Sequence, residues 1–585
     1  MTNTKNEIMK NGFLTLGAFF SLLSAIGQQN CNCDVTLSGL SQNSLNGIWA
    51  SQVNYQPGDV ICIPAGNYAG LRFYNFEGTE TAPLTIINCG GQVVIDETNY
   101  SGLEFRNSKY IHVTGTGDSN HYYGIKIEGT SSWAMGVAIG DFSTDFEVDH
   151  VEVESAGFAG IMAKTDPICS NSATWRTSGF VMKNLDIHHN HIQNTGGEGI
   201  YIGFTLGYKL KTFRYCSGTP VFGHWLENVD VHHNIVEQTG WDAIQLNLVN
   251  LNGKIRDNQI LDYATEGRWA QAFAISLGGG TYEVYNNLIV NGPTETGAGI
   301  QLISGESGSK IYNNVLVKPK EHGIFLHNRH VFDDVNEGYY IVNNTIIEPQ
   351  KAGVHLNADI YYAVDPNDVN RKQDEVPSHF VNNLIVDPGY DFSNSNFWKK
   401  DQESYFDFNA PSTRDSLLPN IYSNIMTRQI DTLGLNDTAN DEYWPGSQTS
   451  SVVDVGHDVS AWGIVIDLEN NSRPSGTAFD IGAYEYQVSG TSLRAAIPTN
   501  LESTTPLEAK TYLYPNPSKT KFTLYNPQID GSVSLQITSS ENKVIYEGSY
   551  IMGSPFYIDD VSSGLYFLKI LNGDQTETYK LMVID

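Results

Sequence analysis

Short runs of alternating apolar and polar residues fill most of the chain between residues 57 and 486. Apolar residues at every second position place one face of a strand against a core and leave the other face in a polar environment. Gly, Asn, Asp and Ser separate the runs, and these residues favour turns. Gly (55) and Tyr (32) are frequent and charged residues make up only 17%. The pattern therefore predicts an all-β protein of many short strands.

The runs recur as copies of one unit, in which two short alternating strands flank a turn. The copies lie at 148–163, 185–202, 229–246, 283–302, 311–326 and 341–356. An Asn recurs in the turn, at Asn190, Asn234, Asn258, Asn287, Asn314, Asn344 and Asn383. In four copies a small residue follows this Asn after nine positions, and a branched apolar residue comes next. Repetition at short periods indicates a solenoid.

This repeat is typical of a right-handed parallel β-helix, in which the strands of each coil pair with those of the coils above and below. Asn suits the turn column because it tolerates the left-handed conformation. Stacked side-chain amides can also form hydrogen bonds from coil to coil. Leucine-rich and β-propeller arrays are less favoured because their signature repeats are absent. We expect the β-helix to span residues 28–487.

Residues 1–27 have the features of a secretory signal peptide. Lys5 and Lys10 precede an apolar run from Phe13 to Ile26, and a small-x-small cleavage site ends at Gly27. The run is too short for a membrane span. The net charge of −31 disfavours a nucleic-acid partner. We therefore expect an exported, monomeric protein without a membrane span in its mature form.

Six cysteines are expected to pair in an exported chain. They are Cys31, Cys33, Cys62, Cys89, Cys169 and Cys216. No Cys-x-x-Cys is present and the spacing fits no zinc site, so thiolate ligation of a metal is disfavoured.

Three segments resemble known families. Residues 57–96 resemble the first coils of β-helix polysaccharide lyases and hydrolases, and RPSGTAFDIGAYEY (473–486) resembles the end of exported bacterial β-helix proteins. Residues 488–509 are rich in Ser, Thr, Ala and Pro, which indicates a linker. Residues 510–585, with YPNPS, GLYFLKI and a terminal KLMVID, resemble the C-terminal sorting domain of the type IX secretion system.

That last resemblance implies recognition by the type IX secretion machinery, transport across an outer membrane, and release or anchoring at the cell surface. Alternating strands in the segment suggest a small antiparallel β-sandwich. An ordinary sugar-binding β-module is the alternative interpretation.

One column of the stacked copies carries two carboxylates. The residue before the small–apolar pair is Ala159, Glu198, Asp242, Ala298, His322 and Ala352 in successive copies. Glu198 and Asp242 thus fall on consecutive coils, about 4.8 Å apart. Repulsion at that spacing raises one pKa and sets an acid beside a carboxylate base or nucleophile, the pair that glycoside hydrolysis uses. Alternatively, both carboxylates solvate a turn or bind an ion.

The element Asp242-Ala243-Ile244 also resembles the Asp-Cys-Ile or Asp-Gly-Ile element of pectin-type β-helix hydrolases. We assign Asp242 as the proton donor because Trp241 and the insertions described next would desolvate it. Glu198 would be the ionised partner. The reverse assignment remains open, since the two titrations are coupled.

Two insertions, residues 164–180 and 203–225, leave the helix at the same corner of consecutive coils. Each holds one cysteine, so we expect a Cys169–Cys216 disulfide to join them into a lid. The lid has five cations against one acid and many aromatic residues, which suits an anionic polysaccharide. The alternative is a loop pair packed on itself. The predicted substrate-binding residues are Lys164, Arg176, Tyr201, Lys209, Lys211, Arg214, Trp241 and His322.

Two His-His pairs and one polar insertion are further candidates. His188-His189 and His232-His233 offer acid–base groups or metal ligands, although a structural ladder is the favoured interpretation. Asp359, Asp365 and Asp368 could hold a structural Ca²⁺, but solvated loop acids are favoured. We expect no other cofactor, and the sequence leaves any catalytic metal unassigned.

Three functions remain open. The favoured one is a glycoside hydrolase acting on an anionic polysaccharide; the architecture and lid resemble exported hydrolases of sulfated, fucan- or carrageenan-like polysaccharides. The second is a lyase for uronate-containing polysaccharide, with Lys164, Lys209, Tyr201 or a paired His as base. The acidic calcium cluster of the familiar pectate and alginate lyases cannot be placed, which counts against it. The third is a non-catalytic, glycan-binding surface protein, for which a lid over a carboxylate pair is unusual.

Overall fold

The computed structural model describes most of the chain as two compact units, residues 1–495 and 496–585. The described residues are 32–96, 99–205, 214–268, 271–291, 297–303, 308–327, 338–357, 378–389, 406–408, 420–437, 442–487, 512–514, 521–525, 532–539, 543–551, 555–557, 564–572 and 575–583. The predicted signal peptide (1–27) and linker (488–509) lie outside them, as do Cys31, Asp359, Asp365 and Asp368.

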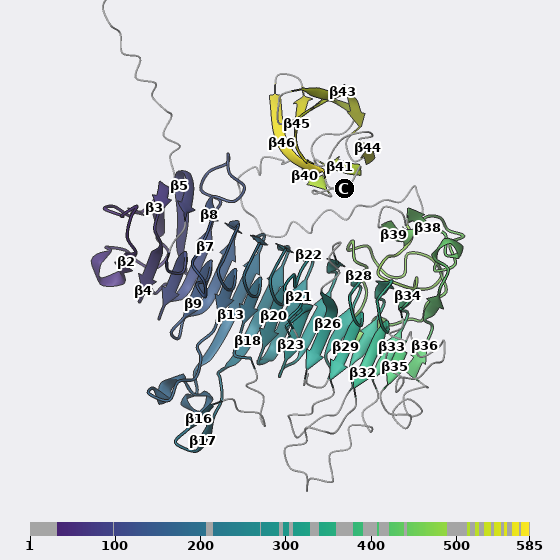
Figure 1. Ribbon diagram of the computed structural model, residues 1–585, viewed down its shortest axis with the longest axis horizontal. Coiled ribbons are helices and arrows are strands. Elements are labelled where there is room, and N and C mark those ends of the chain that lie inside the picture. The colour runs from purple at the N-terminus through teal and green to yellow at the C-terminus, as the bar shows by residue number, and fades with distance from the viewer. Residues whose placement is uncertain are drawn as a thin grey trace, which may run out of the picture. The chain divides into compact units, whose positions relative to one another are not determined.

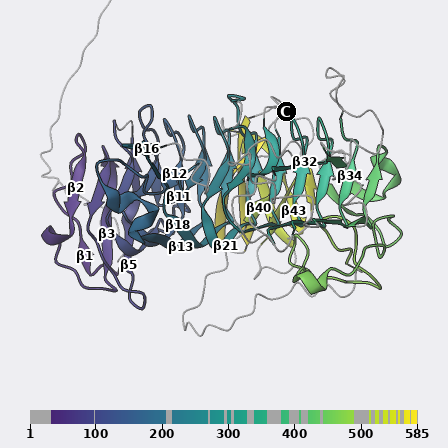
Figure 2. The ribbon, with the colours of Figure 1, turned by 90° about the horizontal axis from the view of Figure 1, so that it is seen from below.

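The first unit is a right-handed parallel β-helix, as predicted (Figure 1). Each full coil gives two strands, separated by a bend, to a large sheet that we call sheet A, and one strand to a second sheet, sheet B. Figure 2 shows the same stack of coils turned by 90°. Within the described residues the two sheets have 23 and 12 strands, and no helix there is long and apolar enough to cross a membrane.

Sheet A is formed by two columns of strands. Before the bend lie β1 (Val35–Thr36), β3 (Val60–Tyr68), β5 (Leu84–Ile95), β7 (Lys109–Thr114), β10 (Thr144–Asp149), β13 (Val181–His188), β18 (Trp225–His232), β21 (Val249–Arg256), β24 (Tyr282–Tyr285), β27 (Lys310–Tyr312), β30 (Tyr340–Val342), β33 (His379–Val381) and β36 (Ile421–Tyr422). The strands β3 and β5 continue through the bend, and their last three residues belong to the second column. After it lie β8 (Ile125–Ile127), β11 (Val151–Val153), β14 (His191–Gln193), β19 (Ile235–Glu237), β22 (Gln259–Leu261), β25 (Leu288–Val290), β28 (Val315–Val317), β31 (Thr345–Ile347), β34 (Leu384–Val386) and β37 (Ile425–Thr427).

Sheet B has one strand per coil. Its strands are β2 (Asn46–Trp49), β4 (Leu71–Tyr74), β6 (Leu103–Arg106), β9 (Val137–Gly140), β12 (Ile161–Ala163), β15 (Ile200–Ile202), β20 (Ile244–Asn247), β23 (Phe273–Gly278), β26 (Ala298–Ile303), β29 (Ile324–His327), β32 (Val354–Asn357) and β35 (Phe406–Phe408). Ile161, Ile200, Ile244 and Ile275 are paired in register and fully buried. Apolar residues therefore stack in rows along the core, as the alternation predicts.

A ladder of Asn side chains runs through the bend of sheet A. Each Asn Nδ2 donates to the Oδ1 of the Asn on the next coil at 2.9–3.1 Å. The rungs are Asn190, Asn234, Asn258, Asn287, Asn314, Asn344, Asn383 and Asn424. The predicted ladder is therefore confirmed and gains an eighth rung.

The other reason given for Asn, its tolerance of the left-handed conformation, was wrong by one position. The left-handed residue is the one before each rung, such as His189, His233 and Asp257, with φ of 53° to 54°. The ladder Asn is not among the residues with positive φ. Its role is to satisfy the buried backbone: its Oδ1 accepts the main-chain N–H of the preceding rung, at 3.0 Å between Asn258 and Asn234.

The segment 473–486 closes the β-helix by packing on sheet A. The N–H of Gly482 donates to the carbonyl of Asn382 (2.9 Å), and the N–H of Ala483 donates to Thr345 Oγ1 (2.9 Å). Arg473 and Glu485 form an ion pair of 2.8 Å, and both side chains are completely buried. The closing motif is therefore a structural element that covers apolar residues of the last coils.

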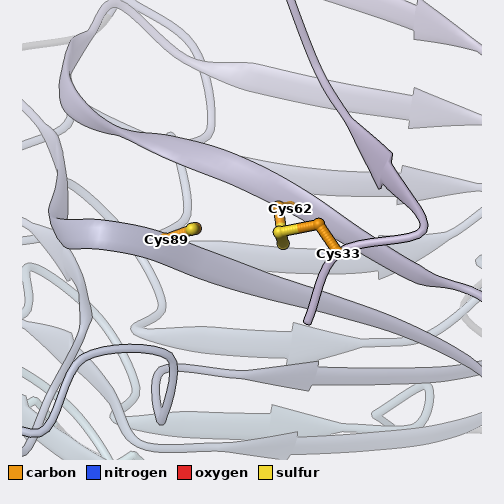
Figure 3. A group of neighbouring side chains, drawn as sticks. All are labelled: Cys33, Cys62 and Cys89. Atoms are coloured by element: carbon orange, nitrogen blue, oxygen red, sulfur yellow. A yellow bond between two sulfur atoms is a disulfide. The ribbon is translucent and has the colours of Figure 1, made fainter. Parts of the chain in front are cut away.

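The first coils are held by disulfides. Cys33 and Cys62 are joined across β1 and β3, and Cys89 lies on the adjacent β5 (Figure 3). Cys89 is also disulfide-bonded, and none of the described cysteines is free. This cysteine group therefore offers no thiolate ligands to a metal ion.

The second unit consists of two antiparallel sheets. One contains β40 (Tyr512–Tyr514), β41 (Lys521–Tyr525) and β44 (Pro555–Tyr557). The other contains β43 (Val544–Ile551), β42 (Ser532–Ser539), β45 (Gly564–Asn572) and β46 (Gln575–Val583). Its core includes Leu535, Ile537, Leu568 and Ile570. The small antiparallel β-fold predicted for this region is confirmed.

Removing one rung of the ladder should destabilise the β-helix. Asn258→Ala removes the Oδ1 that accepts from the main-chain N–H and the Nδ2 of Asn234, and the Nδ2 that donates to the Val231 carbonyl and to Asn287 Oδ1. We expect a loss of at least about 2 kcal/mol in the free energy of unfolding. The control is Gln259→Ala at the exposed neighbouring position, which should change it by less than about 0.5 kcal/mol. Denaturant unfolding checks this, and equal midpoints for both variants would count against the ladder.

Candidate active site on sheet B

The two predicted carboxylates stack on consecutive coils. The N–H of Gly160 donates to the carbonyl of Glu198, and the N–H of Gly199 donates to that of Asp242, each at 3.0 Å. The next residue in the column is Phe273, whose carbonyl accepts from Ala243 N at 3.0 Å. The stacking expected from the sequence is thus confirmed, with Phe273 as an additional member. The catalytic roles remain predictions.

The glycine after Glu198 has a steric cause. A Cβ on Gly199 would lie 2.5 Å from the side chain of Val236 and 2.6 Å from the carbonyl oxygen of Ala243. Such distances are far below van der Waals contact. Glycine therefore allows the coil to turn closely enough to bring Glu198 beside Asp242.

Both carboxylates are buried, with exposed fractions of 1% for Glu198 and 0% for Asp242. Glu198 Oε1 accepts a hydrogen bond from Gln271 Nε2 (3.2 Å), and Asp242 Oδ1 accepts one from the N–H of Phe273 (2.9 Å). Glu198 Oε2 and Asp242 Oδ2 have no hydrogen-bond partner among the described residues. Two carboxyl oxygens with free acceptor capacity are thus held together in a buried place.

Burial changes the protonation of the pair. It raises the pKa of Glu198 to about 7, although the positive charges of Lys164 and Arg268 oppose the shift. Burial, and then the charge of Glu198, hold the pKa of Asp242 well above its ordinary value. Glu198 therefore exchanges its proton near neutral pH, and Asp242 holds its proton more tightly than an ordinary aspartic acid does. From the sequence we expected a raised pKa for one carboxyl. The pKa values of both are raised, because both carboxyls are removed from water.

A row of buried polar side chains runs beside the pair. Tyr201, Gln245, Ser276 and Gln301 are aligned on β15, β20, β23 and β26, and each is less than 8% exposed. Gln301 Nε2 donates to Ser276 Oγ (3.2 Å). Of this row only Tyr201 was predicted from the sequence. Aligning the copies three positions beyond the carboxylates would have revealed the others.

Aromatic residues border the pair on the side of the earlier coils. Trp133, Phe158 and Trp241, which we call the aromatic corner, contact one another with ring centroids 5.5–6.1 Å apart. Arg268 is exposed and stacks over Trp241, 3.8 Å from its centroid. Trp133 is 67% exposed. Because Trp241 directly precedes Asp242 in the chain, the corner presents an aromatic face and a cation beside that carboxyl.

Lys164 joins this region from the end of β12. Its Nζ lies 4.2 Å from the centroid of the Tyr201 ring and 3.1 Å from Asp166 Oδ2. The Tyr201 hydroxyl forms a hydrogen bond of 2.6 Å with Thr205 Oγ1. Lys164, Tyr201 and Trp241 are thus three predicted binding residues that the structure brings to the carboxylates.

The lid is joined as predicted, by the Cys169–Cys216 disulfide. Its described elements are the turns η2 (Ser172–Thr174) and η3 (Arg176–Ser178) and a hairpin of β16 (Arg214–Cys216) and β17 (Thr219–Val221). Arg176 stacks 3.8 Å from the centroid of Trp225 and donates to the Gly223 carbonyl (2.9 Å). Arg176 thus connects the two halves of the lid, and its part in substrate binding stays a prediction.

Of the remaining predicted binding residues, the structure describes only the side chain of His322, and it does not lie beside the pair. Lys209, Lys211 and the side chain of Arg214 lie outside the described residues. His322 belongs to the same column as the carboxylates but lies three strands beyond Asp242, about 14 Å away by strand spacing. Its ring stacks on His355 at 4.4 Å between centroids.

Comparison with known proteins identifies the second unit. Residues 512–584 match the family described as "Secretion system C-terminal sorting domain". The predicted type IX sorting domain is therefore confirmed, and the protein is secreted or displayed at the cell surface. No curated protein matches the chain. The crystal structure of pectate lyase Pel9A is similar, with a TM-score of 0.36 and 12% identity over 76% of this chain and 97% of that one.

Neutralising Glu198 should stabilise the protein at alkaline pH. The pKa of Glu198 is raised from 4.5 to about 7, so its contribution to stability is full below pH 4.5 and is lost as the pH rises through 7. Ionised Glu198 then costs about 3 kcal/mol. We expect Glu198→Gln to unfold at a higher temperature than wild type at pH 8 and at an equal temperature near pH 4.

The matched control is Glu283→Gln on sheet A, where the carboxylate is partly exposed and pairs with Lys310 at 3.3 Å. It should bring no gain at pH 8. Thermal unfolding at both pH values checks this prediction. A Glu198→Gln variant that is less stable than the wild type at pH 8 would show that the protein solvates the charge of Glu198 favourably, which would contradict it.

Opening the lid disulfide should loosen the lid alone. The buried core of the β-helix is built from other residues, so Cys169→Ser should leave its melting temperature nearly unchanged. We expect faster protease cleavage within the two insertions, 164–180 and 203–225, and weaker binding of the substrate. Cys33→Ser, which opens the disulfide of the first coils, should leave the lid protected. Mapped cleavage sites check this, and an unchanged lid would mean that the disulfide is dispensable there.

Proposed function

We propose that this secreted protein is a glycoside hydrolase that cleaves an anionic polysaccharide. The observation that carries the proposal is the buried pair of Glu198 and Asp242 on adjacent strands, both with raised pKa values. A carboxyl that holds its proton near neutral pH can protonate a leaving glycosidic oxygen, and an ionised neighbour can act as base or nucleophile. Asp242 is the proton donor in this scheme and Glu198 is its partner.

The surroundings of the pair favour an anionic sugar chain. The exposed ring of Trp133 suits the apolar face of a sugar, and the exposed Arg268 suits a sulfate or carboxylate. Gln245 Oε1 is buried without a hydrogen-bond partner among the described residues and could accept from a sugar hydroxyl. Because both carboxyls are buried, substrate entry requires side chains around Gln271 and Arg268 to move.

A lyase is the second candidate, because Lys164 and Tyr201 lie together beside Glu198. Proton abstraction needs a group that is unprotonated near neutral pH. Burial lowers the pKa of Lys164, but Tyr201 and Asp166 outweigh it, so the pKa is raised overall. Burial also raises the pKa of Tyr201. Both groups hold their protons, which favours hydrolysis over β-elimination.

Digestion of a panel of sulfated and uronate polysaccharides tests the proposal. Hydrolysis creates reducing ends without a new double bond, whereas a lyase product absorbs in the ultraviolet. We expect reducing ends alone. An unsaturated product would replace the hydrolase by a lyase, and no turnover on any member would favour a glycan-binding protein.

The carboxamide variants test the roles of the pair. Glu198→Gln and Asp242→Asn should each lower turnover by about 10²-fold or more, while Glu283→Gln should keep wild-type activity. In the wild type, kcat/KM should rise with pH through about 7 as Glu198 ionises, and fall again when Asp242 loses its proton. Near-wild-type activity in both variants, with activity lost in Tyr201→Phe, would contradict the proposal.

A further inference from the structure

A second group of titratable residues lies on sheet A, away from the carboxylate pair. Six histidines and four acids occupy three neighbouring columns on the coils of β7, β10, β13 and β18. In strand register these are His112, Glu147, Asp186 and Asp230, then Asp149, His188 and His232, then the bend residues His150, His189 and His233. We call this group the histidine cluster.

Imidazole and carboxylate atoms converge within the cluster. His232 Nε2 lies 2.9 Å from Asp186 Oδ1, and the rings of His188 and His232 stack with centroids 4.8 Å apart. One ligand atom each of Asp186, His188 and His232 lies within 4.8 Å of the others. Glu147 Oε1, at 3.1 Å from His188 Nε2, adds a carboxylate at the side. Small side-chain rotations would bring three donors to the 2.0–2.2 Å distances of a bound zinc ion.

In His188 and His232, the ring nitrogen that would not bind the metal already contacts a neighbouring histidine. His188 Nδ1 and His189 Nδ1 are 2.8 Å apart, and the same distance separates His232 Nδ1 from His233 Nδ1. The left-handed backbone at the bend fixes the supporting rings, with φ of 54° at His189 and 53° at His233. Metal-bound histidines are commonly oriented in this way by a partner on the second nitrogen.

A merely structural ladder does not account for the choice of histidine. The bend column continues with Asp257, Asn286, Asn313, Asn343 and Asn382, and these residues adopt the same left-handed conformation on later coils. The strand column after His232 continues with Arg256, Tyr285 and Tyr312. The fold therefore does not require imidazole at these positions, and among the described sheet A strands it is the coils of β7, β10, β13 and β18 that collect it beside acids.

We propose that the histidine cluster binds a divalent transition-metal ion of the zinc type, with Asp186, His188 and His232 as protein ligands. Mixed imidazole and carboxylate donors suit zinc, whereas calcium takes oxygen ligands. The coil of His188 continues into Glu198, and the coil of His232 continues into Asp242. The ion would thus link the two coils that carry the carboxylates, and the site is independent of the proposed hydrolase activity.

Calorimetric titration with Zn²⁺ after removal of metal by a chelator tests the site in the full chain. We expect one ion per chain in the wild type, and at least 100-fold weaker binding in His188→Asn and His232→Asn. The matched control is His121→Gln, which removes an isolated His–Asp pair with 2.7 Å between His121 Nδ1 and Asp118 Oδ2. Equal binding by the wild type and by His188→Asn, or loss of binding in His121→Gln, would overturn the proposal.

A second measurement needs no variant. Co²⁺ bound by two imidazoles and a carboxylate in a tetrahedral site gives visible absorption that Zn²⁺ displaces, and Zn²⁺ should raise the melting temperature of the wild type. Absence of both effects at one equivalent of metal would likewise overturn the site, even if a variant failed to fold.

Discussion

Hydrogen bonds between successive coils determine which residues lie beside one another in this molecule. Parallel pairing fixes a register, and the buried Asn ladder holds that register at the bend of sheet A. A shift of one residue in any coil would turn Ile200 or Ile244 away from the core and break the ladder. Residues 44 positions apart in the chain, such as Glu198 and Asp242, are neighbours only because of this constraint.

The same constraint explains why the carboxylate pair is costly to keep. A residue in this column is covered by the strands and turns around it, so two acids placed there lose their water and repel each other. Later coils carry Phe273 and Ala298 at the same positions. The fold thus accepts apolar residues in this column. Because two acids lower the stability there, their presence is better explained by a catalytic role than by a role in folding.

The sequence predicted those parts of the molecule that depend on the repeat. The Asn column, the Glu198–Asp242 stack and the antiparallel second unit all follow from periodicity, and the lid disulfide followed from two cysteines on equivalent insertions. The coil of Phe273 was missed because the turn between β22 and β23 is longer than in other copies, which breaks the nine-residue spacing.

Contacts made by irregular segments could not be predicted in this way. Gln271 and Arg268 come from that longer turn and reach Glu198 and Trp241 on other coils. The stacking of the Arg176 guanidinium on Trp225 inside the lid was likewise not foreseen, and its part in substrate binding stays a prediction. Side-chain direction in such segments depends on local packing, which leaves no periodic trace in the sequence.

The central claim is that burial and stacking make the two carboxyls titrate as an ordered pair. Carbon-13 NMR of the labelled side-chain carboxyl groups, followed against pH in the wild type and both carboxamide variants, measures this directly. The account predicts a pKa for Glu198 that stays near 7 in Asp242→Asn, and a pKa for Asp242 that falls in Glu198→Gln because the neighbouring charge is gone. Two independent titrations near the ordinary carboxyl values of about 4 would contradict it.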